Sequence, residues 1–490
     1  MGREGIRRRE LIAGGMAVVA GGALTGADGT LAAEGPRSRR SAGGRLYDVA
    51  VVGAGLAGLN AARVVRDAGR SVIVLEARQR VGGRNLDHEI APGKVVELGG
   101  EWAGPGQDRV LGLARDLGVR TFATYSRGDS VYFRAGGELQ AYSGGIPPVD
   151  PVSLGELATT IAELNRMATS VPVDAPWTAP SAFTWDRQTC QTWISENISS
   201  PVARNLTELA IRSVYGEEPK QISLLDLLQA IGSVGGDLNT LIGSSQSIRF
   251  VGGPQQLSKI LARRLGDAVR MGVAITAISQ GTDVTLHSTA GNSYRARRAI
   301  VTVPKTLAGR ITFDPPLPPA LDQFLQRQPN GSVVKVNAIY RTPFWREKGL
   351  NGSATSEVGP IRVTYDNSPP DGFPGVLVGF MEGDDSRAFY GVGRAARRRA
   401  ALASFARYFG PEALRPIAYV DLDWAREPFT RGAYGSINPP GVLTSLHDPT
   451  AEAFGALHYA SSDSSALWSG YMDGAIRSGE QAAAAALASL

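Results

Sequence analysis

The order of apolar and polar positions predicts a strand–helix–strand unit near the start of the folded part of the chain. Residues 47–52 are a short apolar run, which is typical of a buried strand. Helix-forming residues follow over 56–66, and Gly69 ends this stretch. Residues 71–77, SVIVLEA, form a second apolar run. Together these segments predict a βαβ unit.

Similar patterns recur further along the chain. Residues 294–305, YRARRAIVTVPK, indicate another strand, whereas residues 154–168 and 223–231 indicate amphipathic helices. Strands that alternate with helices indicate the α/β fold class.

A glycine-rich motif joins the first predicted strand to its helix. Gly53 permits a tight turn, Gly55 lets the backbone approach a pyrophosphate, and Gly58 lets the helix pack on the strand. The helix would direct its N-terminal amides at the phosphates. Glu76 follows 18 residues after Gly58, where a ribose needs a hydrogen-bond acceptor. A chance glycine-rich turn is the alternative, but the combined spacing favours a dinucleotide site.

The residues after Glu76 favour FAD over NAD. The segment EARQRVGGR brings Arg78, Gly83 and Arg84 close to the first phosphate site. A second glycine pair and a guanidinium suit a longer and more deeply buried cofactor. An unrelated turn with a solvated arginine remains the alternative.

Length and composition describe an ordinary globular protein. The chain has 490 residues, 43% hydrophobic and 20% charged, which suggests two or more domains. Most of the net charge of +5 comes from residues 1–45, so the remainder has no reason to bind nucleic acid. Cys190, the single cysteine, excludes an internal disulfide framework. The four histidines are scattered and form no metal-ligand pattern.

The N-terminal segment has the features of an export signal. Residues 1–33 contain a twin-arginine pattern, Arg7-Arg8-Arg9, before a weakly apolar run and small residues. The run over residues 11–24 is shorter than the roughly 20 apolar residues that span a bilayer, so we expect no transmembrane segment. Residues 34–45 read as a linker. We therefore expect twin-arginine export to the periplasm or the extracellular space, with a basic cytoplasmic tail as the alternative.

Many segments in one order resemble the flavin-containing amine oxidase family, and specifically its monoamine-oxidase-like branch. The first carries the glycine motif and EARQRVGGR. The others are VVELGGEWAGPGQDRVLGLARDLGV, FVGGPQQLSKILARRLGD, TFDPPLPPALDQ, GSVVKVNAIYRTPFWREKG, WAREPFTRGAYGSINPPG and LWSGYMDGAIRSGEQAAAA. The resemblance covers nearly everything after the linker.

The resemblance implies a discontinuous Rossmann-like FAD-binding domain with an inserted α+β substrate-binding domain. The FAD-binding domain would comprise residues 46–124, 240–323 and 427–490. The substrate-binding domain would comprise residues 125–239 and 324–426.

The resemblance also implies a site. Lys335 matches a lysine that holds a water against flavin N5 and is implicated in reoxidation by oxygen. Tyr434 and Tyr471 match two aromatic residues that flank the substrate amine. Strand alternation over GSVVKVNAIY puts Val333, Lys335, Asn337 and Ile339 on one face and Val334, Val336 and Ala338 on the other. From the residues alone, a solvated lysine and two packing tyrosines are the alternatives.

Further cofactor contacts follow from the same resemblance. Ile275 matches a strand position whose backbone meets the adenine, and Trp424 matches a tryptophan packed near the flavin. Asp463 keeps a carboxylate in a motif that relatives write AGxE. The last helix begins near Met472, so that its N-terminal amides would face the flavin.

Three positions depart from the family pattern. Close relatives attach the flavin through a cysteine just before the first of the two tyrosines, and this chain has Ala433 there. We therefore expect non-covalent FAD. Ser461 replaces a glycine that lies against the cofactor, and Leu467 replaces a polar residue.

The implied function is oxidation of a CH–NH bond in a small amine, with molecular oxygen as the second substrate and hydrogen peroxide as product. The alternatives are a tailoring oxidase of a secondary metabolite, an L-amino-acid oxidase, a polyamine oxidase, or a flavin-binding protein with little oxidase activity. An amino-acid oxidase needs an arginine clamp after the cofactor arginine, where this chain has LGGEWAGPG. A homodimer is a possible assembly.

Export gives the first testable prediction. Changing Arg8 and Arg9 together to lysine should hold the protein in the cytoplasm, because the pathway reads guanidinium pairs. Cell fractionation and immunoblotting would measure this. Unchanged export of the double variant would contradict the twin-arginine signal, whereas a wild-type protein found only in the cytoplasm would support the cytoplasmic-tail alternative for residues 1–33.

Overall fold

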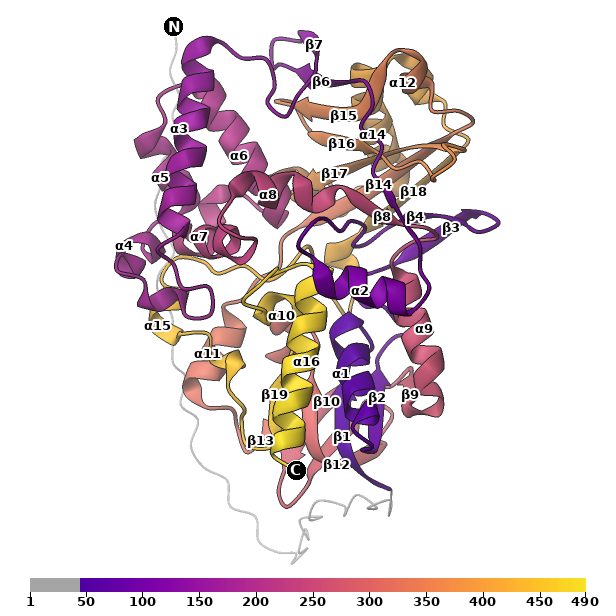
Figure 1. The fold of residues 1–490 in the computed structure, drawn as a ribbon, viewed down its shortest axis with the longest axis vertical. Coiled ribbons are helices and arrows are strands. Elements are labelled where there is room, and N and C mark those ends of the chain that lie inside the picture. The colour runs from indigo at the N-terminus through magenta and orange to yellow at the C-terminus, as the bar shows by residue number, and fades with distance from the viewer. Residues whose placement is uncertain (1–44) are drawn as a thin grey trace, which may run out of the picture. The chain divides into compact units, whose positions relative to one another are not determined.

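Two large β-sheets and their helices make up the computed structural model, which describes residues 45–490 (Figure 1). The predicted signal segment, residues 1–33, and almost all of the predicted linker lie outside the described residues. Within residues 45–490, no helix has both the length and the apolar character needed to cross a bilayer.

The first sheet has the strand order β13-β10-β11-β12-β1-β2-β9, with β19 beside β12. Its strands are β1 (Leu46–Val52), β2 (Val72–Glu76), β9 (Val269–Met271), β10 (Ile275–Gln280), β11 (Val284–Ser288), β12 (Ser293–Val301), β13 (Thr312–Asp314) and β19 (Leu457–Tyr459). Strand β1 lies parallel to both β2 and β12, and helix α1 (Leu56–Asp67) connects β1 to β2. The predicted βαβ unit is confirmed.

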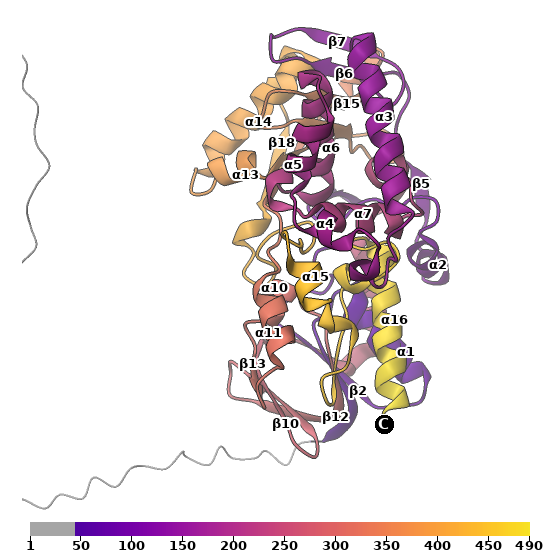
Figure 2. The same cartoon turned by 90° about the vertical axis from the view of Figure 1, so that its left-hand side faces the viewer.

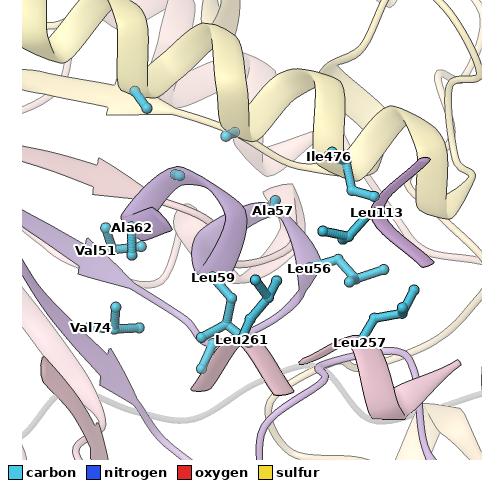
Figure 3. Packing of buried hydrophobic residues seen from close by; sticks show 14 of the residues in the cluster. Val51, Leu56, Ala57, Leu59, Ala62, Val74, Leu113, Leu257, Leu261 and Ile476 are labelled. Atoms are coloured by element: carbon cyan, nitrogen blue, oxygen red, sulfur yellow. The ribbon is translucent and has the colours of Figure 1, made fainter. Parts of the chain in front are cut away.

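Helices α1 and α16 (Met472–Ala488) lie side by side on this sheet (Figures 1 and 2). They approach closely because Gly479 has no side chain. A Cβ there would lie 2.4 Å from the carbonyl oxygen of Ala57. Figure 3 shows the surrounding core, in which Leu59 of α1 points toward Leu261 and Ile476 of α16 toward Leu113.

The second sheet has the strand order β18-β14-β17-β16-β15-β6-β7. Its strands are β6 (Asp129–Phe133), β7 (Leu139–Tyr142), β14 (Val333–Tyr340), β15 (Leu350–Ser356), β16 (Val363–Asp366), β17 (Gly375–Glu382) and β18 (Ala418–Asp423). Every residue of β14 and β17 is buried, so both faces of the central strands are covered.

Strand β14 shows the predicted alternation. Val334 and Val336 pack with Phe405 of α14 (Arg394–Phe409) on one face. On the other face, Lys335 donates to the backbone carbonyl of Gly99 and Asn337 donates to that of Glu97. Lys335 therefore faces the interior rather than solvent.

A layer of helices packs beside the second sheet (Figure 2). It contains α3 (Pro151–Ala168), α4 (Ala182–Asp186), α5 (Cys190–Asn197), α6 (Pro201–Tyr215), α7 (Leu224–Ser233) and α8 (Leu238–Ile242). Helix α3 begins three residues earlier than predicted, because Asp150 accepts a hydrogen bond from the Ser153 amide and Pro151 suits the first turn. Ser223 caps α7 rather than beginning it.

The remaining elements connect these layers. The helices are α2 (Asp108–Asp116), α9 (Gln255–Leu265), α10 (Lys305–Ala308), α11 (Pro319–Gln326), α12 (Phe344–Glu347), α13 (Asp384–Ala388) and α15 (Val442–Leu446). Two small sheets pair β3 (Asp87–Ala91) with β4 (Lys94–Glu97) and β5 (Thr121–Ala123) with β8 (Ile248–Phe250).

The close helix contact gives a stability prediction. Gly479→Ala should destabilise the protein by about 1–3 kcal/mol, because the new methyl group must push α1 and α16 apart. Gly155→Ala in exposed α3 is the matched control, since a Cβ there meets nothing within 4 Å. It should stabilise by about 0.5–1 kcal/mol. Thermal unfolding would compare the two, and equal midpoints would contradict the proposed helix contact.

Candidate active site

A cavity of about 1000 Å³ extends from the glycine motif of the first sheet to the buried face of the second. All of the predicted site residues line it except Gly58. The lining residues among them are Gly53, Gly55, Glu76, Arg78, Gly83, Arg84, Ile275, Lys335, Trp424, Tyr434, Asp463, Tyr471 and Met472.

The glycine motif forms a backbone cradle at one end. Gly53 has φ +109°, and a Cβ on Gly58 would lie 2.1 Å from the carbonyl oxygen of Gly53, so Gly58 serves helix–strand packing. A Cβ on Gly83 would lie 3.3 Å from the Cα of Gly55. Because Gly55 caps α1 without a side chain, the first-turn amides have no side-chain acceptor at the cap. Such a cradle fits a pyrophosphate.

Glu76 lies at the end of β2 and is buried. One carboxylate oxygen accepts from the amide of Ala54 at 2.7 Å, and the other accepts from the amide of Arg78 at 2.9 Å. A carboxylate has about four acceptor positions, so it can still accept from ribose hydroxyls. Its placement fits the ribose role that the sequence predicts.

Arg84 joins the glycine loop to the C-terminal segment. Its guanidinium donates to the Asp463 carboxylate at 3.2 Å, to the Ser462 hydroxyl at 2.9 Å and to the Tyr434 carbonyl at 2.8 Å. Burial raises the pKa of Asp463, but Arg84, the Ser462 hydroxyl and Lys305 together outweigh burial and hold this pKa below its usual value. The Ser461 hydroxyl, at the position that departs from the family, accepts from the Asp463 amide.

The other predicted cofactor residues are held by specific contacts. The Arg78 guanidinium donates to the Thr430 hydroxyl at 2.6 Å. The Trp424 indole donates to the Leu98 carbonyl at 2.8 Å. The Met472 sulfur accepts from the Asn85 amide group at 3.1 Å. Ile275 is the first residue of β10.

Lys335 belongs to a buried ion network. Its ammonium donates to Glu101 at 2.7 Å and to the Gly99 carbonyl at 2.9 Å. Arg249 of β8 pairs with the other Glu101 oxygen at 3.1 Å and with Glu97 at 2.9 Å. All four charged side chains are at most 3% exposed. Each buried charge here needs an oppositely charged neighbour, because an unpaired buried charge carries a large desolvation cost.

Aromatic rings surround the lysine. The ammonium lies 5.1 Å from the centre of the Trp102 ring and 5.5 Å from that of Phe380. Glu97 and Glu101 were not singled out from the sequence. Two acids four residues apart in VVELGGEWAG are the only local signal for them.

Tyr434 and Tyr471 line the same cavity, and each hydroxyl is anchored. Tyr434 donates to Glu382 at 2.8 Å, and the Phe380 ring packs against it edge-on. Tyr471 donates to the Leu241 carbonyl at 3.0 Å and packs edge-on against Trp468. The rings are therefore fixed from two different layers, the second sheet and the helices.

Glu382 is a second cavity residue that the sequence analysis missed. It ends β17, is 3% exposed and lines the cavity beside Tyr434. Burial raises its pKa to about 7, while the hydrogen bond from Tyr434 acts in the opposite direction. In FMEGDDSR it resembles the start of an exposed acidic turn.

No thiol adjoins the first cavity tyrosine. Ala433 is buried and lines the cavity at the position where relatives carry a cysteine. Cys190 is fully buried in α5, does not line the cavity, and has a pKa raised by burial. This placement suits a small buried hydrophobic residue rather than a nucleophile.

Comparison with known proteins gives consistent matches. The family model for flavin-containing amine oxidoreductases matches residues 56–487. A protein of Mycobacterium tuberculosis named as a flavin-containing monoamine oxidase, AofH, is 39% identical over 441 residues, 89% of this chain and 96% of that protein. A flavin-containing amine oxidase of Danio rerio is 34% identical, covering 89% and 85%.

Solved structures agree. A putrescine oxidase bound to putrescine has 34% identity and a TM-score of 0.87, covering 91% of this chain and 99% of its own. Cyclohexylamine oxidase from Brevibacterium oxydans IH-35A has 30% identity and a TM-score of 0.86, covering 91% and 99%. The predicted fold class is confirmed.

The ion network gives a prediction about stability. Lys335→Met should destabilise the protein by about 3–5 kcal/mol, because Glu101 loses one of its two cationic partners in a buried site. Adding Glu101→Gln should restore part of that loss, because it removes the carboxylate charge. Chemical denaturation of the two single variants and the double variant would measure the coupling. Fully additive losses would show that Lys335 and Glu101 do not act as a pair.

Proposed function

Because the chain belongs to the family of flavin-containing amine oxidoreductases, we propose that it oxidises the CH–NH bond of a small amine. The product would be an imine that hydrolyses to an aldehyde or ketone, with oxygen reduced to hydrogen peroxide. One observation carries the proposal: a single cavity joins the glycine cradle and Glu76 to Lys335 and the tyrosine pair.

The protein's own residues bind and orient the reactants. Bound FAD would supply the acceptor for the hydride and return the electrons to oxygen. Tyr434 and Tyr471 would restrict the amine by shape and offer negative ring faces to its nitrogen. A buried, aromatic-lined cavity favours the neutral amine, whose lone pair the oxidation requires. Lys335, held by Glu101, would place its ammonium beside the reacting centre.

FAD would be held without a covalent bond. The residues present fit the cofactor through the glycine cradle, Glu76 and Arg84, whereas Ala433 offers no sulfur for attachment. The affinity for FAD would then depend on non-covalent contacts alone.

An amino-acid oxidase is the second candidate function, and the hydrogen bonds of Arg84 bear on it. It would require an arginine free to bind a carboxylate. The Arg84 guanidinium already donates hydrogen bonds to Asp463, to Ser462 and to the Tyr434 carbonyl. Relatives named for oxidation of monoamines, putrescine and cyclohexylamine also favour an amine substrate.

The purified yellow protein tests the proposal. Amines should bleach it without oxygen, and readmitting oxygen should restore the colour with formation of hydrogen peroxide, whereas matching amino acids should do neither. Acid precipitation should release the flavin into the supernatant. A spectrophotometer and a coupled peroxidase assay suffice. Bleaching by no amine would favour a flavin-binding protein with little activity, and a yellow pellet would contradict non-covalent binding.

A further inference from the structure

Glu382 carries a buried carboxylate that has no cationic partner. Its two oxygens accept from the Tyr434 hydroxyl at 2.8 Å and from the Ser213 hydroxyl of α6 at 3.4 Å. No lysine, arginine or histidine among residues 45–490 lies within ion-pair distance of it. Other carboxylates of the cavity are paired differently. These are Glu101 with Lys335 and Arg249, Asp463 with Arg84, Asp448 with Lys305, Glu76 with two backbone amides, and Asp226 with the Asn438 amide group.

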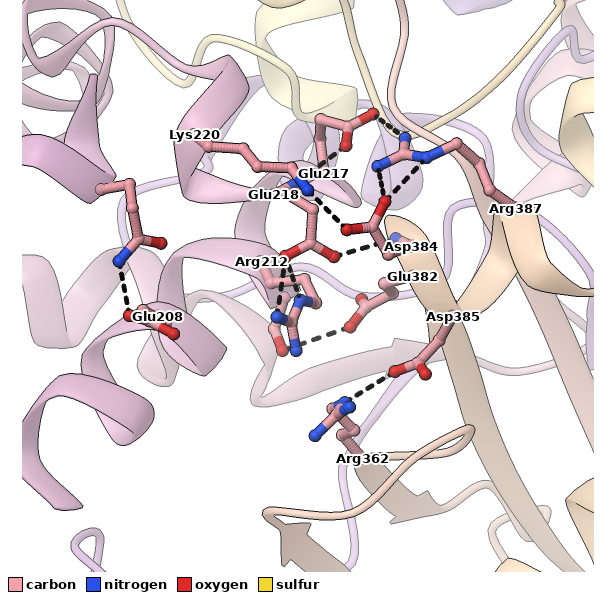
Figure 4. Close-up of polar contacts among 12 residues, drawn as sticks. Glu208, Arg212, Glu217, Glu218, Lys220, Arg362, Glu382, Asp384, Asp385 and Arg387 are labelled. Carbon is pink, nitrogen blue, oxygen red and sulfur yellow. Dashed lines mark hydrogen bonds and ion pairs between the residues drawn. The ribbon is translucent and has the colours of Figure 1, made fainter. Parts of the chain in front are cut away.

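The cations around Glu382 are already engaged. Arg212 precedes Ser213 in the chain, but its guanidinium donates to Glu218 at 2.8 and 3.1 Å. Figure 4 shows Glu382 between Arg212 and the acids that follow β17. The neighbouring pairs are Arg212 with Glu218, Arg387 with Glu217 and Asp384, Lys220 with Asp384, and Arg362 with Asp385. Glu382 remains without an ion pair in this cluster.

An ionised carboxylate without a cationic partner in a buried cavity carries a large desolvation cost. A positively charged ligand would offset that cost. Arg212 favours the charged form of Glu382 and Asp385 opposes it, with burial as the larger influence on its pKa. A positively charged group in the cavity would stabilise the ionised carboxylate and would itself be stabilised. The site therefore has the chemistry of a cation subsite.

The reacting nitrogen is an unsuitable partner for this carboxylate. A nearby negative charge favours the ammonium form of an amine, and that form has no lone pair to support loss of hydride from the adjacent carbon. The carboxylate fits a different positive group on the same substrate molecule.

We propose that Glu382 and Ser213 form a cation subsite at the edge of the tyrosine pair, and that the preferred substrates are amines with a second positively charged group. This inference rests on the proposed amine oxidation. The oxidised carbon would lie between Tyr434 and Tyr471, and the second ammonium would bind where the Tyr434 hydroxyl meets Glu382. Short α,ω-diamines are the simplest members of this class.

Three matched substrates test the subsite. For the wild-type holoenzyme, kcat/KM would be measured with 1,5-diaminopentane, 5-amino-1-pentanol and n-pentylamine, which differ in the far group. The diamine should be preferred over both. In Glu382→Gln the ratio of diamine to pentylamine kcat/KM should fall about tenfold or more, mainly through KM, because an amide cannot pair with a buried cation. Glu382→Asp should recover part of the preference.

The control is Asp384→Asn, which removes the same charge two residues away. Asp384 is 57% exposed and pairs with Lys220 and Arg387 outside the cavity. Its ratio should match the wild type. Taking a ratio separates recognition from general damage, since misfolding lowers turnover of both substrates together.

The possible outcomes are distinct. An unchanged ratio in Glu382→Gln would overturn the subsite while leaving amine oxidation intact. An equal loss for both substrates would also overturn it, because Glu382 would then act on the tyrosine pair or the reacting nitrogen. If none of the three amines bleaches the wild-type flavin, the proposed function itself fails for this substrate class.

Discussion

The buried ion network of Glu97, Glu101, Arg249 and Lys335 is the interaction on which the cavity depends. Four charged side chains are buried together, and burial of each charge is tolerated only because an oppositely charged partner lies beside it. The partners come from β4, the loop after it, β8 and β14, which are distant in sequence. Arg249 also donates to the Ser368 carbonyl just after β16. The network therefore fixes the second sheet against β4 and the cavity-lining segment that follows it.

The tyrosine pair depends on the same arrangement of layers. Tyr434 is anchored to β17 through Glu382, whereas Tyr471 is anchored to α8 through the Leu241 carbonyl. Tyr471 also directly precedes α16, whose Gly479 packs closely on α1. Helix α1, helix α16 and the cavity wall that carries Tyr471 are thus one packed unit. The other wall belongs to the second sheet.

Local sequence patterns predicted the parts of this structure that local chemistry determines. Glycine spacing predicted the turn between β1 and α1, and alternation along β14 put Lys335 and Asn337 on one face. The helix starts were less well predicted, because the cap at Asp150 extends α3 beyond its apolar pattern. The roles of Lys335 and the tyrosines were inferred from the family resemblance. The residues alone could not show them, because many lysines are merely solvent-exposed and many tyrosines only pack in the core.

Glu101 and Glu382 could not be recognised as site residues from the sequence, because their roles depend on partners that are distant in the sequence. Glu101 meets Lys335 from 234 positions away, and Glu382 meets Tyr434 from 52 positions away. Two acids and two bases form an electrically neutral set, so the field of the buried network falls off steeply with distance. The Glu382 carboxylate has no such cationic partner, and when it is ionised its negative potential extends into the cavity that it lines. In the proposed reaction, long-range attraction of a cationic substrate and contact with its reacting carbon therefore involve different residues.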